Sequence, residues 1–315
     1  MARNAYSVLV PGSLMLMGEH AVLKGHPCLV AALDQRMCVS ATVRSDRDIQ
    51  ITSALGKVTW CLDALPSTDP VFTFILAVVH ALQAELSHGY DIRVEATFSD
   101  QLGFGSSAAV VVGTLAVLTQ SIRGTSIPPM ELLALSRRII QSVQGFGSGA
   151  DVAASIFGGV VLHIPEVTTR VIAKTLPLVV VYSGAKEKTT VVVKKVNDRM
   201  SLQPTVIQPI YEAMHQGVLA GVSAIQAQDW LMLGQIMNTQ HGLMNALGVS
   251  NISLETLLHL LRESKGVWGA KISGSGLGDC VIATGCLSQA SDLSLSMPQR
   301  QLHVSVSPEG LQYVM

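Results

Sequence analysis

The sequence has few aromatic and few charged residues. Aromatic residues make up 4% of its 315 residues and charged residues 14%, whereas hydrophobic residues make up 49%. This balance excludes an intrinsically disordered chain, which would be rich in charge and poor in apolar residues. The formal net charge is −1 and there is no run of Lys and Arg. A surface that binds a phosphate backbone is therefore excluded, and we expect no nucleic-acid partner.

Paired cysteines and long hydrophobic runs are also lacking. The five cysteines form no Cys-x-x-Cys pair, which argues against a disulfide framework or a structural zinc site and favours reduced, buried thiols in the cytoplasm. The longest apolar stretches, 71–82 and 106–122, are interrupted by Thr, Gly or His. Neither supplies the ~20 apolar residues of a membrane-spanning helix. We expect both to be buried helices, and no membrane partner.

The remaining pattern predicts two blocks, 1–173 and 174–315, of mixed strands and helices. In the first block it predicts strands at 7–10, 14–17, 37–43, 48–52, 92–98 and 158–164, and helices at 71–86, 108–122 and 130–144. In the second block it predicts strands at 178–182, 271–273 and 280–283, and helices at 208–247 and 254–264. Paired strands mixed with helices indicate the α+β class.

A glycine loop at 103–109, Gly-Phe-Gly-Ser-Ser-Ala-Ala, leads directly into an apolar helical stretch. Glycine lets the backbone approach a ligand closely, and a helix start presents free N–H groups to an anion. Ser106 and Ser107 add hydroxyl donors and could supply a metal ligand, so the loop suits a polyphosphate. A tight turn with Ser106 as the N-cap would explain the same residues. The loop lacks the lysine of a Walker P-loop.

Two further glycine loops follow, and the first of them supplies a candidate carboxylate. Residues 145–151 precede a helical segment and end in Asp151, which could reach a substrate hydroxyl or simply cap the helix. Residues 273–279 join two expected strands and alone could be a wide hairpin. Near the N-terminus, Glu19 and His20 stand side by side among small residues, which favours a polar ligand pocket, although a lone histidine is usually structural. Three glycine loops in one chain are not easily explained as structural turns alone.

These segments, in this order, resemble the GHMP kinases, the superfamily of galactokinase, homoserine kinase, mevalonate kinase and phosphomevalonate kinase. The resemblance covers nearly the whole chain; segments 11–27, 237–241, 246–250 and 269–271 are most similar to mevalonate kinases. It implies an α+β fold of two domains, with residues 1–173 like ribosomal protein S5 domain 2 and residues 174–315 ferredoxin-like. ATP and Mg²⁺ would bind with the substrate between them.

The resemblance also implies roles for matching residues. Asp151 would be the catalytic base, and Glu19, His20 and Thr189 would bind the substrate. ATP would be bound by Gly103, Gly105, Ser106, Ser107, Ala108, Gly274, Ser275 and Gly276, and Mg²⁺ by Ser107. Our own hypothesis adds Glu19 as a residue that helps to hold Mg²⁺, directly or through water. The implied reaction is the phosphorylation of mevalonate to 5-phosphomevalonate in isoprenoid biosynthesis, by a cytoplasmic enzyme that could form a homodimer.

Two positions depart from the family pattern. Ser13 replaces the lysine usual after Pro-Gly, and Ile140 replaces an acidic metal ligand. Phosphoryl transfer depends chiefly on positioning and electrostatic stabilisation, so another cation could compensate; the candidates are Lys24, Lys186 and Lys188. The lost charges also leave open a non-catalytic metabolite sensor, although the retained Asp151 argues against it.

Phosphomevalonate kinase is the nearest alternative, because segments 144–154 and 278–280 resemble loops of that enzyme. Its substrate carries an additional phosphate, which needs cations to hold it. No obvious basic cluster flanks the expected pocket. The available cations are Arg137, Arg138, Lys194 and Lys195.

Overall fold

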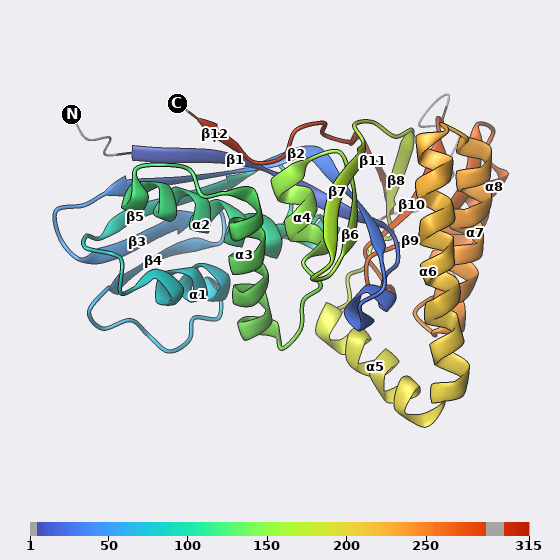
Figure 1. Ribbon diagram of the computed structural model, residues 1–315, viewed down its shortest axis with the longest axis horizontal. Helices are drawn as coiled ribbons and strands as arrows, with labels where there is room; N and C mark the ends of the chain where they lie inside the picture. Colours follow the sequence, from blue (N-terminus) through green and yellow to red (C-terminus); the bar gives the residue numbers. More distant parts are fainter. Residues whose placement is uncertain (1–4, 288–298, 315) are drawn as a thin grey trace.

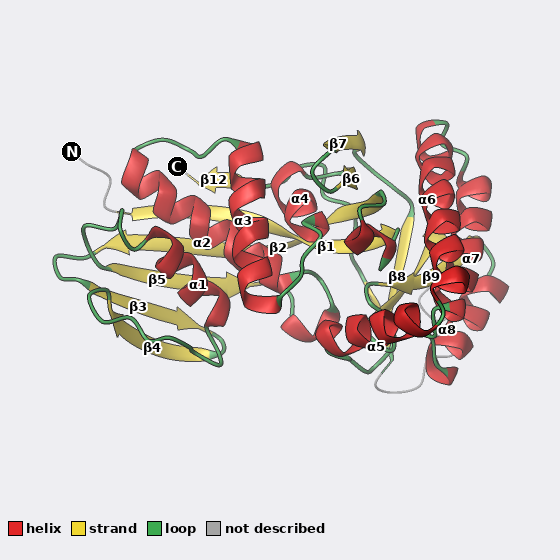
Figure 2. Cartoon of the chain, turned by 60° about the horizontal axis from the view of Figure 1, so that its bottom comes forward, coloured by secondary structure: helices red, strands yellow, loops and turns green. Residues whose placement is uncertain are grey.

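The computed structural model describes residues 5–287 and 299–314, which form two sheets and a set of helices (Figures 1 and 2). The first sheet has the order β12-β1-β2-β5-β3-β4, with β6 paired to β2 and β7 paired to β6. Its strands are β1 (Ala5–Met17), β2 (Cys28–Val43), β3 (Asp48–Ser53), β4 (Gly56–Cys61), β5 (Tyr90–Ala96), β6 (Val160–Ile164), β7 (Thr168–Ala173) and β12 (Gln312–Val314). The second sheet has the order β11-β8-β10-β9, from β8 (Leu178–Tyr182), β9 (Val267–Ser273), β10 (Cys280–Gly285) and β11 (Arg300–Leu302). The predicted α+β class is confirmed.

Helices α1 (Thr73–Leu82), α2 (Ser106–Arg123), α3 (Pro129–Gln144) and α4 (Ala150–Phe157) lie together on one face of the first sheet (Figure 1). Helix α2 packs against β1 and β2. In the described part of the chain it is the one helix that is long and apolar enough to cross a membrane, but 61% of that stretch is buried within the molecule. We therefore interpret α2 as a core helix.

The second sheet carries its own helices at the other end of the molecule. Helices α7 (Trp230–Ala246) and α8 (Ile252–Glu263) pack on β9 and β10, and α6 (Pro204–Gln226) packs against α7 and α5 (Thr189–Leu202) (Figure 2). Alternate residues of a strand point to opposite faces. Val180 and Ile282 accordingly belong to the core of the first sheet, whereas Val181 and Val281 pack with the helices. The second sheet is therefore buried on both faces and shares an apolar core with the first.

The structure corrects several predicted boundaries. Strand β1 is continuous where the sequence predicts two strands around Pro11-Gly12. Its pairing with β2 shifts register between Pro11 and Ser13, so a bulge accommodates residues that would otherwise end a strand. The helix predicted over 208–247 is divided into α6 and α7 by a turn in which Gln228 has a φ of 54°. Strands β4 and β7 and helix α5 have no counterpart in the prediction.

The domain boundary after residue 173 stays a prediction. Strand β7 ends at Ala173 in the first sheet and β8 begins at Leu178 in the second. Strand β12, however, returns to the first sheet, where Val314 lies opposite Ser7 of β1. The chain therefore crosses from one sheet to the other more than once.

Candidate active site

A cavity of about 230 Å³ is lined by segments that are far apart in the sequence. Most residues predicted for the site meet there: Glu19, His20, Gly103, Gly105, Ser106, Ser107, Ala108, Asp151, Thr189, Gly274 and Ser275. Gly276 is not among the lining residues. It has a φ of 90°, and a side chain there would clash with the backbone of Val249. Gly276 thus shapes the third glycine loop, and the roles predicted for the other residues stay predictions.

The glycine loop before α2 is fastened to the first sheet. The N–H of Ser13 donates a hydrogen bond to the carbonyl of Phe104 at 3.0 Å. Gly105 is the N-cap of α2, with a φ of 64° and no side-chain capping bond, and a side chain there would clash with the Ser13 hydroxyl. The structure therefore assigns the cap to Gly105 and not to Ser106. The hydroxyls of Ser106 and Ser107 are not needed to cap the helix.

Asp151 lies in the first turn of α4, whose N-cap is Gly149. Its Oδ1 accepts a hydrogen bond from the Ser13 hydroxyl at 2.8 Å. Burial raises the pKa of the Asp151 carboxyl above its ordinary value, and the hydrogen bond from Ser13 partly opposes this. No ion pair joins Asp151 to a cation among the residues that the structure describes. A carboxylate with a raised pKa is a better proton acceptor than an ordinary one.

None of the candidate replacement cations forms an ion pair with Asp151 among the described residues. Lys186 lines the cavity, but its Nζ donates a hydrogen bond to the carbonyl of Asp100. Lys24 and Lys188 are not lining residues. The hydroxyl of Ser13 itself donates a hydrogen bond to Asp151. The structure therefore has a neutral hydrogen-bond donor at the position where the family pattern has a charged lysine. Ile140 also lines the cavity and offers no ligand atom to a metal.

Glu19 forms a buried ion pair with Lys271 of β9. Lys271 is 0% exposed and Glu19 3% exposed, and the Nζ of Lys271 donates to both Glu19 Oε1 and the carbonyl of Ile272. Burial lowers the pKa of Lys271, whereas the Glu19 charge raises it. The second oxygen of Glu19 has no hydrogen-bond partner among the described residues. The predicted metal role of Glu19 stays a prediction, and its ion pair weighs against it.

His20 fastens the same region to the third glycine loop. Its Nε2–H donates to the carbonyl of Ser275 at 2.8 Å, and its backbone has a φ of 62°. Burial lowers the pKa of His20, and the hydrogen bond to Ser275 partly opposes this. A neutral imidazole is therefore favoured near neutral pH. Together with the Glu19–Lys271 pair, His20 holds the end of β1 against the second sheet.

Asp279 is a site residue that the sequence analysis missed. It lines the cavity, has a φ of 59°, and its Oδ1 is buried with no hydrogen-bond partner in the described part of the chain. It lies beside the loop before α2, because a side chain on Gly103 would come within 2.9 Å of the Asp279 carboxyl carbon. Burial raises the pKa of Asp279 to about 6; the charge of Lys186 lowers it and that of Asp151 raises it. The sequence signal was an aspartate inside a glycine loop.

We expect Asp279→Asn to stabilise the protein without ligands above pH 6. The native carboxyl keeps its proton up to about pH 6, whereas an unfolded aspartate releases it near its ordinary pKa of 3.8. Between these values the native state binds more protons, so the free energy of unfolding of the wild type falls as the pH rises. At 1.36 kcal/mol per pH unit the variant gains roughly 3 kcal/mol at most.

Denaturant unfolding of Asp279→Asn and of the wild type, well above and well below this pH window, measures the gain. Below the window both proteins should have the same free energy of unfolding. An equal difference at every pH would show that the titration of Asp279 is not its source.

A second cavity, of about 490 Å³, adjoins the loop before α2 and was not predicted. Ser106 and Ser107 line both cavities. Most other residues around the second cavity are apolar, among them Met37, Leu55, Val71, Phe72, Phe74, Ile75 and Phe98. An apolar cavity with polar groups at one end suits a flat ring system with a charged tail.

Comparisons with known proteins agree with this geometry. The family descriptions "GHMP kinases N terminal domain" and "GHMP kinases C terminal" match residues 73–159 and 222–299. The chain is 32% identical to a mevalonate kinase from Thermococcus sibiricus over 87% of both chains. Its fold is similar to that of the Methanococcus jannaschii mevalonate kinase (TM-score 0.79, 20% identity, 95% and 98% of the two chains). It is also similar to a Streptococcus pneumoniae phosphomevalonate kinase in complex with phosphomevalonate and AMPPNP (TM-score 0.76, 17% identity, 94% and 99%).

Proposed function

Because the chain belongs to the GHMP kinases, we propose that it transfers the γ-phosphoryl group of ATP to the primary hydroxyl of mevalonate, giving 5-phosphomevalonate. The observation that carries this proposal is that Asp151 and the hydroxyls of Ser106 and Ser107 line one cavity. A proton acceptor and a phosphate-binding loop in one enclosed space are the parts that transfer to an alcohol needs. The similarity to the Thermococcus sibiricus mevalonate kinase supports the choice of substrate. We place the reaction in the cytoplasm.

ATP would span the two cavities. We place the adenine ring in the apolar cavity of about 490 Å³ and the phosphates over Ser106 and Ser107, which border both spaces. The start of α2 would direct its free N–H groups at the phosphates. The γ-phosphate would then enter the cavity that holds Asp151. Thr189, the first residue of α5, lines this cavity. Its hydroxyl would donate a hydrogen bond to the substrate.

The donor set fits Mg²⁺, because the free Oδ1 of Asp279 lies beside the loop that carries the Ser107 hydroxyl, and Mg²⁺ prefers oxygen ligands. Ser107 and Asp279 would hold the ion, which would neutralise phosphate charge. Asp151 would accept the hydroxyl proton at its carboxylate. Ser13 would hold that carboxylate in position without supplying charge.

Ser13→Ala should move the acidic limb of the pH profile of kcat/KM to higher pH. The Ser13 hydrogen bond favours the ionised form of Asp151 and lowers its pKa. Without this bond the base keeps its proton to a higher pH, so activity is lost sooner as the pH falls. Initial rates across the acidic range test this. If the acidic limb of the kcat/KM profile stayed at the same pH and only the plateau value fell, Ser13 would not act through the pKa of Asp151.

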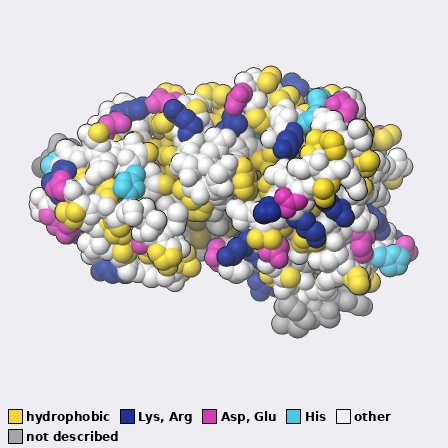
Figure 3. All heavy atoms as spheres, turned by 90° about the horizontal axis from the view of Figure 1, so that it is seen from below, with side chains coloured by type: hydrophobic (Ala, Val, Ile, Leu, Met, Phe, Trp, Pro, Cys, Tyr) yellow, Lys and Arg dark blue, Asp and Glu magenta, His cyan; other side chains and the backbone are white. Residues whose placement is uncertain are grey.

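Phosphomevalonate kinase is the second candidate, because Asp279 lies in the loop that resembles that enzyme. Two of the four available cations, Arg137 and Lys194, have other partners. Arg137 donates a hydrogen bond to the carbonyl of Gly147 and forms an ion pair with Glu166. Lys194 forms an ion pair with Asp198 on α5. Figure 3 shows basic side chains beside acidic ones on this face of the molecule. Lys186 is the one Lys or Arg among the described lining residues. This favours the substrate with fewer phosphates.

A coupled ADP-release assay with ATP, Mg²⁺ and one acceptor at a time tests the proposal. The acceptors are mevalonate, phosphomevalonate, galactose and homoserine. Mevalonate should give the highest kcat/KM. A higher value with phosphomevalonate would replace the proposal by the second candidate. Saturable binding of mevalonate without ADP release would indicate a non-catalytic sensor.

A further inference from the structure

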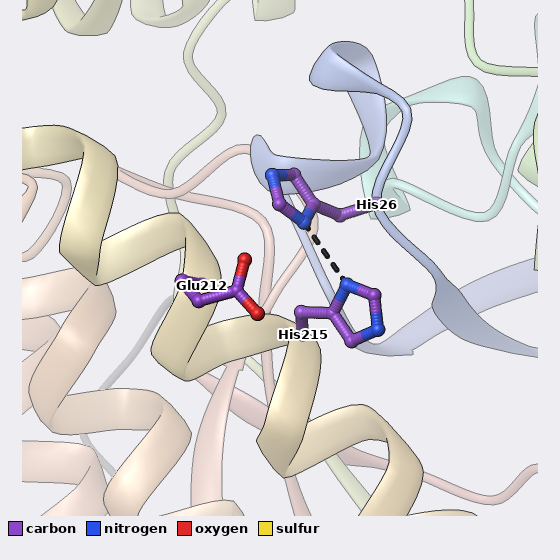
Figure 4. Close-up of side chains that lie close together, drawn as sticks. All are labelled: His26, Glu212 and His215. Carbon is purple, nitrogen blue, oxygen red and sulfur yellow. Dashed lines mark hydrogen bonds between the residues drawn. The ribbon is translucent and has the colours of Figure 1, made fainter.

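A second cluster of polar side chains lies outside both cavities. His26 follows the short 3-10 turn η1 (Ala21–Lys24), and Glu212 and His215 lie three residues apart on α6. The Nδ1 atoms of the two histidines are 3.1 Å apart. One ligand atom from each of the three residues lies within 4.8 Å of the others. Figure 4 shows the carboxylate of Glu212 beside the two imidazole rings, whose Nδ1 atoms point toward each other.

We propose that His26, Glu212 and His215 form a binding site for a divalent first-row transition-metal ion, with Zn²⁺ as the reference ion. Two imidazoles and a carboxylate are a common set of three zinc ligands, with a fourth position left for water. Two nitrogens bound tetrahedrally to one zinc at 2.0–2.1 Å lie about 3.4 Å apart. The observed 3.1 Å between the Nδ1 atoms is close to this spacing.

The arrangement of the three residues favours binding. Residues three apart on a helix share a face, so α6 presents Glu212 and His215 together to His26. Both histidines are partly buried, whereas Glu212 is exposed and its side chain can adjust its position. In Figure 4 the second nitrogen of each ring points away from the pair. Each neutral imidazole can therefore carry its hydrogen there and direct a free Nδ1 at the ion.

The same contact has a simple alternative, a hydrogen bond between two neutral histidines. That alternative needs a hydrogen on one Nδ1 and gives no role to Glu212. The metal site uses all three side chains and joins residues 189 positions apart in the sequence. It would tie η1, whose Val22 and Leu23 line the smaller cavity, to α6 of the second block. A bound ion would thus fix one wall of the proposed active site.

Titration of the full, untagged, chelator-treated chain with Co²⁺ tests the site. We expect one saturable ligand-field spectrum per chain, without thiolate charge transfer, that Zn²⁺ abolishes. His215→Gln and Glu212→Gln should each weaken binding about tenfold or more, while exposed His259 on α8 provides the matched control His259→Gln. Glu212→Gln changes an exposed side chain, so it keeps the test valid if His215→Gln folds poorly.

Thermal unfolding gives an independent measurement. Zn²⁺ should raise the melting temperature of the wild type and of His259→Gln, and that of Glu212→Gln by less at the same Zn²⁺ concentration, because the site exists only in the folded chain. Absence of a saturable spectrum would overturn the proposal. So would an unchanged affinity in the two ligand variants. A thiolate band would assign the ion to exposed Cys61 or Cys286 and would also overturn it.

Discussion

Asp151→Asn should lower kcat with mevalonate by about a hundred- to ten-thousand-fold, the range that a general base contributes. Asparagine keeps an oxygen that can accept the hydrogen bond from Ser13, so the first turn of α4 should keep its geometry. What is lost is a carboxylate whose burial raises its pKa. No cation pairs with Asp151 among the described residues, so the substitution breaks no ion pair there.

Single-turnover rates with saturating ATP and mevalonate measure this loss, and the affinity for ADP shows whether the nucleotide site survives. Asp198→Asn, on the exposed surface of α5, is the matched control and should behave like the wild type. If Asp151→Asn retained wild-type turnover while chemistry limits the rate, Asp151 would not be the base.

Lys271→Met should lower the free energy of unfolding by about 3–5 kcal/mol, as expected when one partner of a buried ion pair is removed. Glu19 is 3% exposed and would be left charged in the interior without Lys271. The double variant Glu19→Gln/Lys271→Met removes the uncompensated charge and should recover much of the loss. The pair joins the turn after β1 to β9, so its loss should loosen the contact between the two sheets.

Denaturant unfolding of the two single variants, the double variant and the wild type completes a double-mutant cycle. Lys194→Met removes an exposed pair between Lys194 and Asp198 and should cost no more than about 0.5 kcal/mol. Equal effects of Lys271→Met and Lys194→Met would show that the buried pair does not hold the sheets together.

The sequence indicated which loops border one cavity better than it predicted the details of the fold. Glycine loops are local signals, because glycines and serines directly before a helix bring its free N–H groups within reach of a ligand. The loops at 103–109 and 145–151 do border one cavity. The cap at Gly105 could not be predicted, because it depends on how closely the loop lies against Ser13 of β1.

Residues whose roles depend on distant partners were missed. Lys271 pairs with Glu19 across 252 positions, and no local pattern indicates which of the lysines is buried. Asp279 gains its raised pKa from burial beside the loop at Gly103, which only the folded chain creates. The three residues of the proposed metal site, His26, Glu212 and His215, likewise have no sequence signature, because His26 and His215 lie 189 positions apart.

We propose that the protein phosphorylates a primary alcohol bound in this cavity. Phosphorus NMR of a reaction of the enzyme with ATP, Mg²⁺ and mevalonate tests it most directly. The account predicts a new phosphate monoester resonance split into a triplet by the neighbouring methylene protons, absent with Asp151→Asn. A singlet from the tertiary hydroxyl, or product only when phosphomevalonate is supplied, would contradict it.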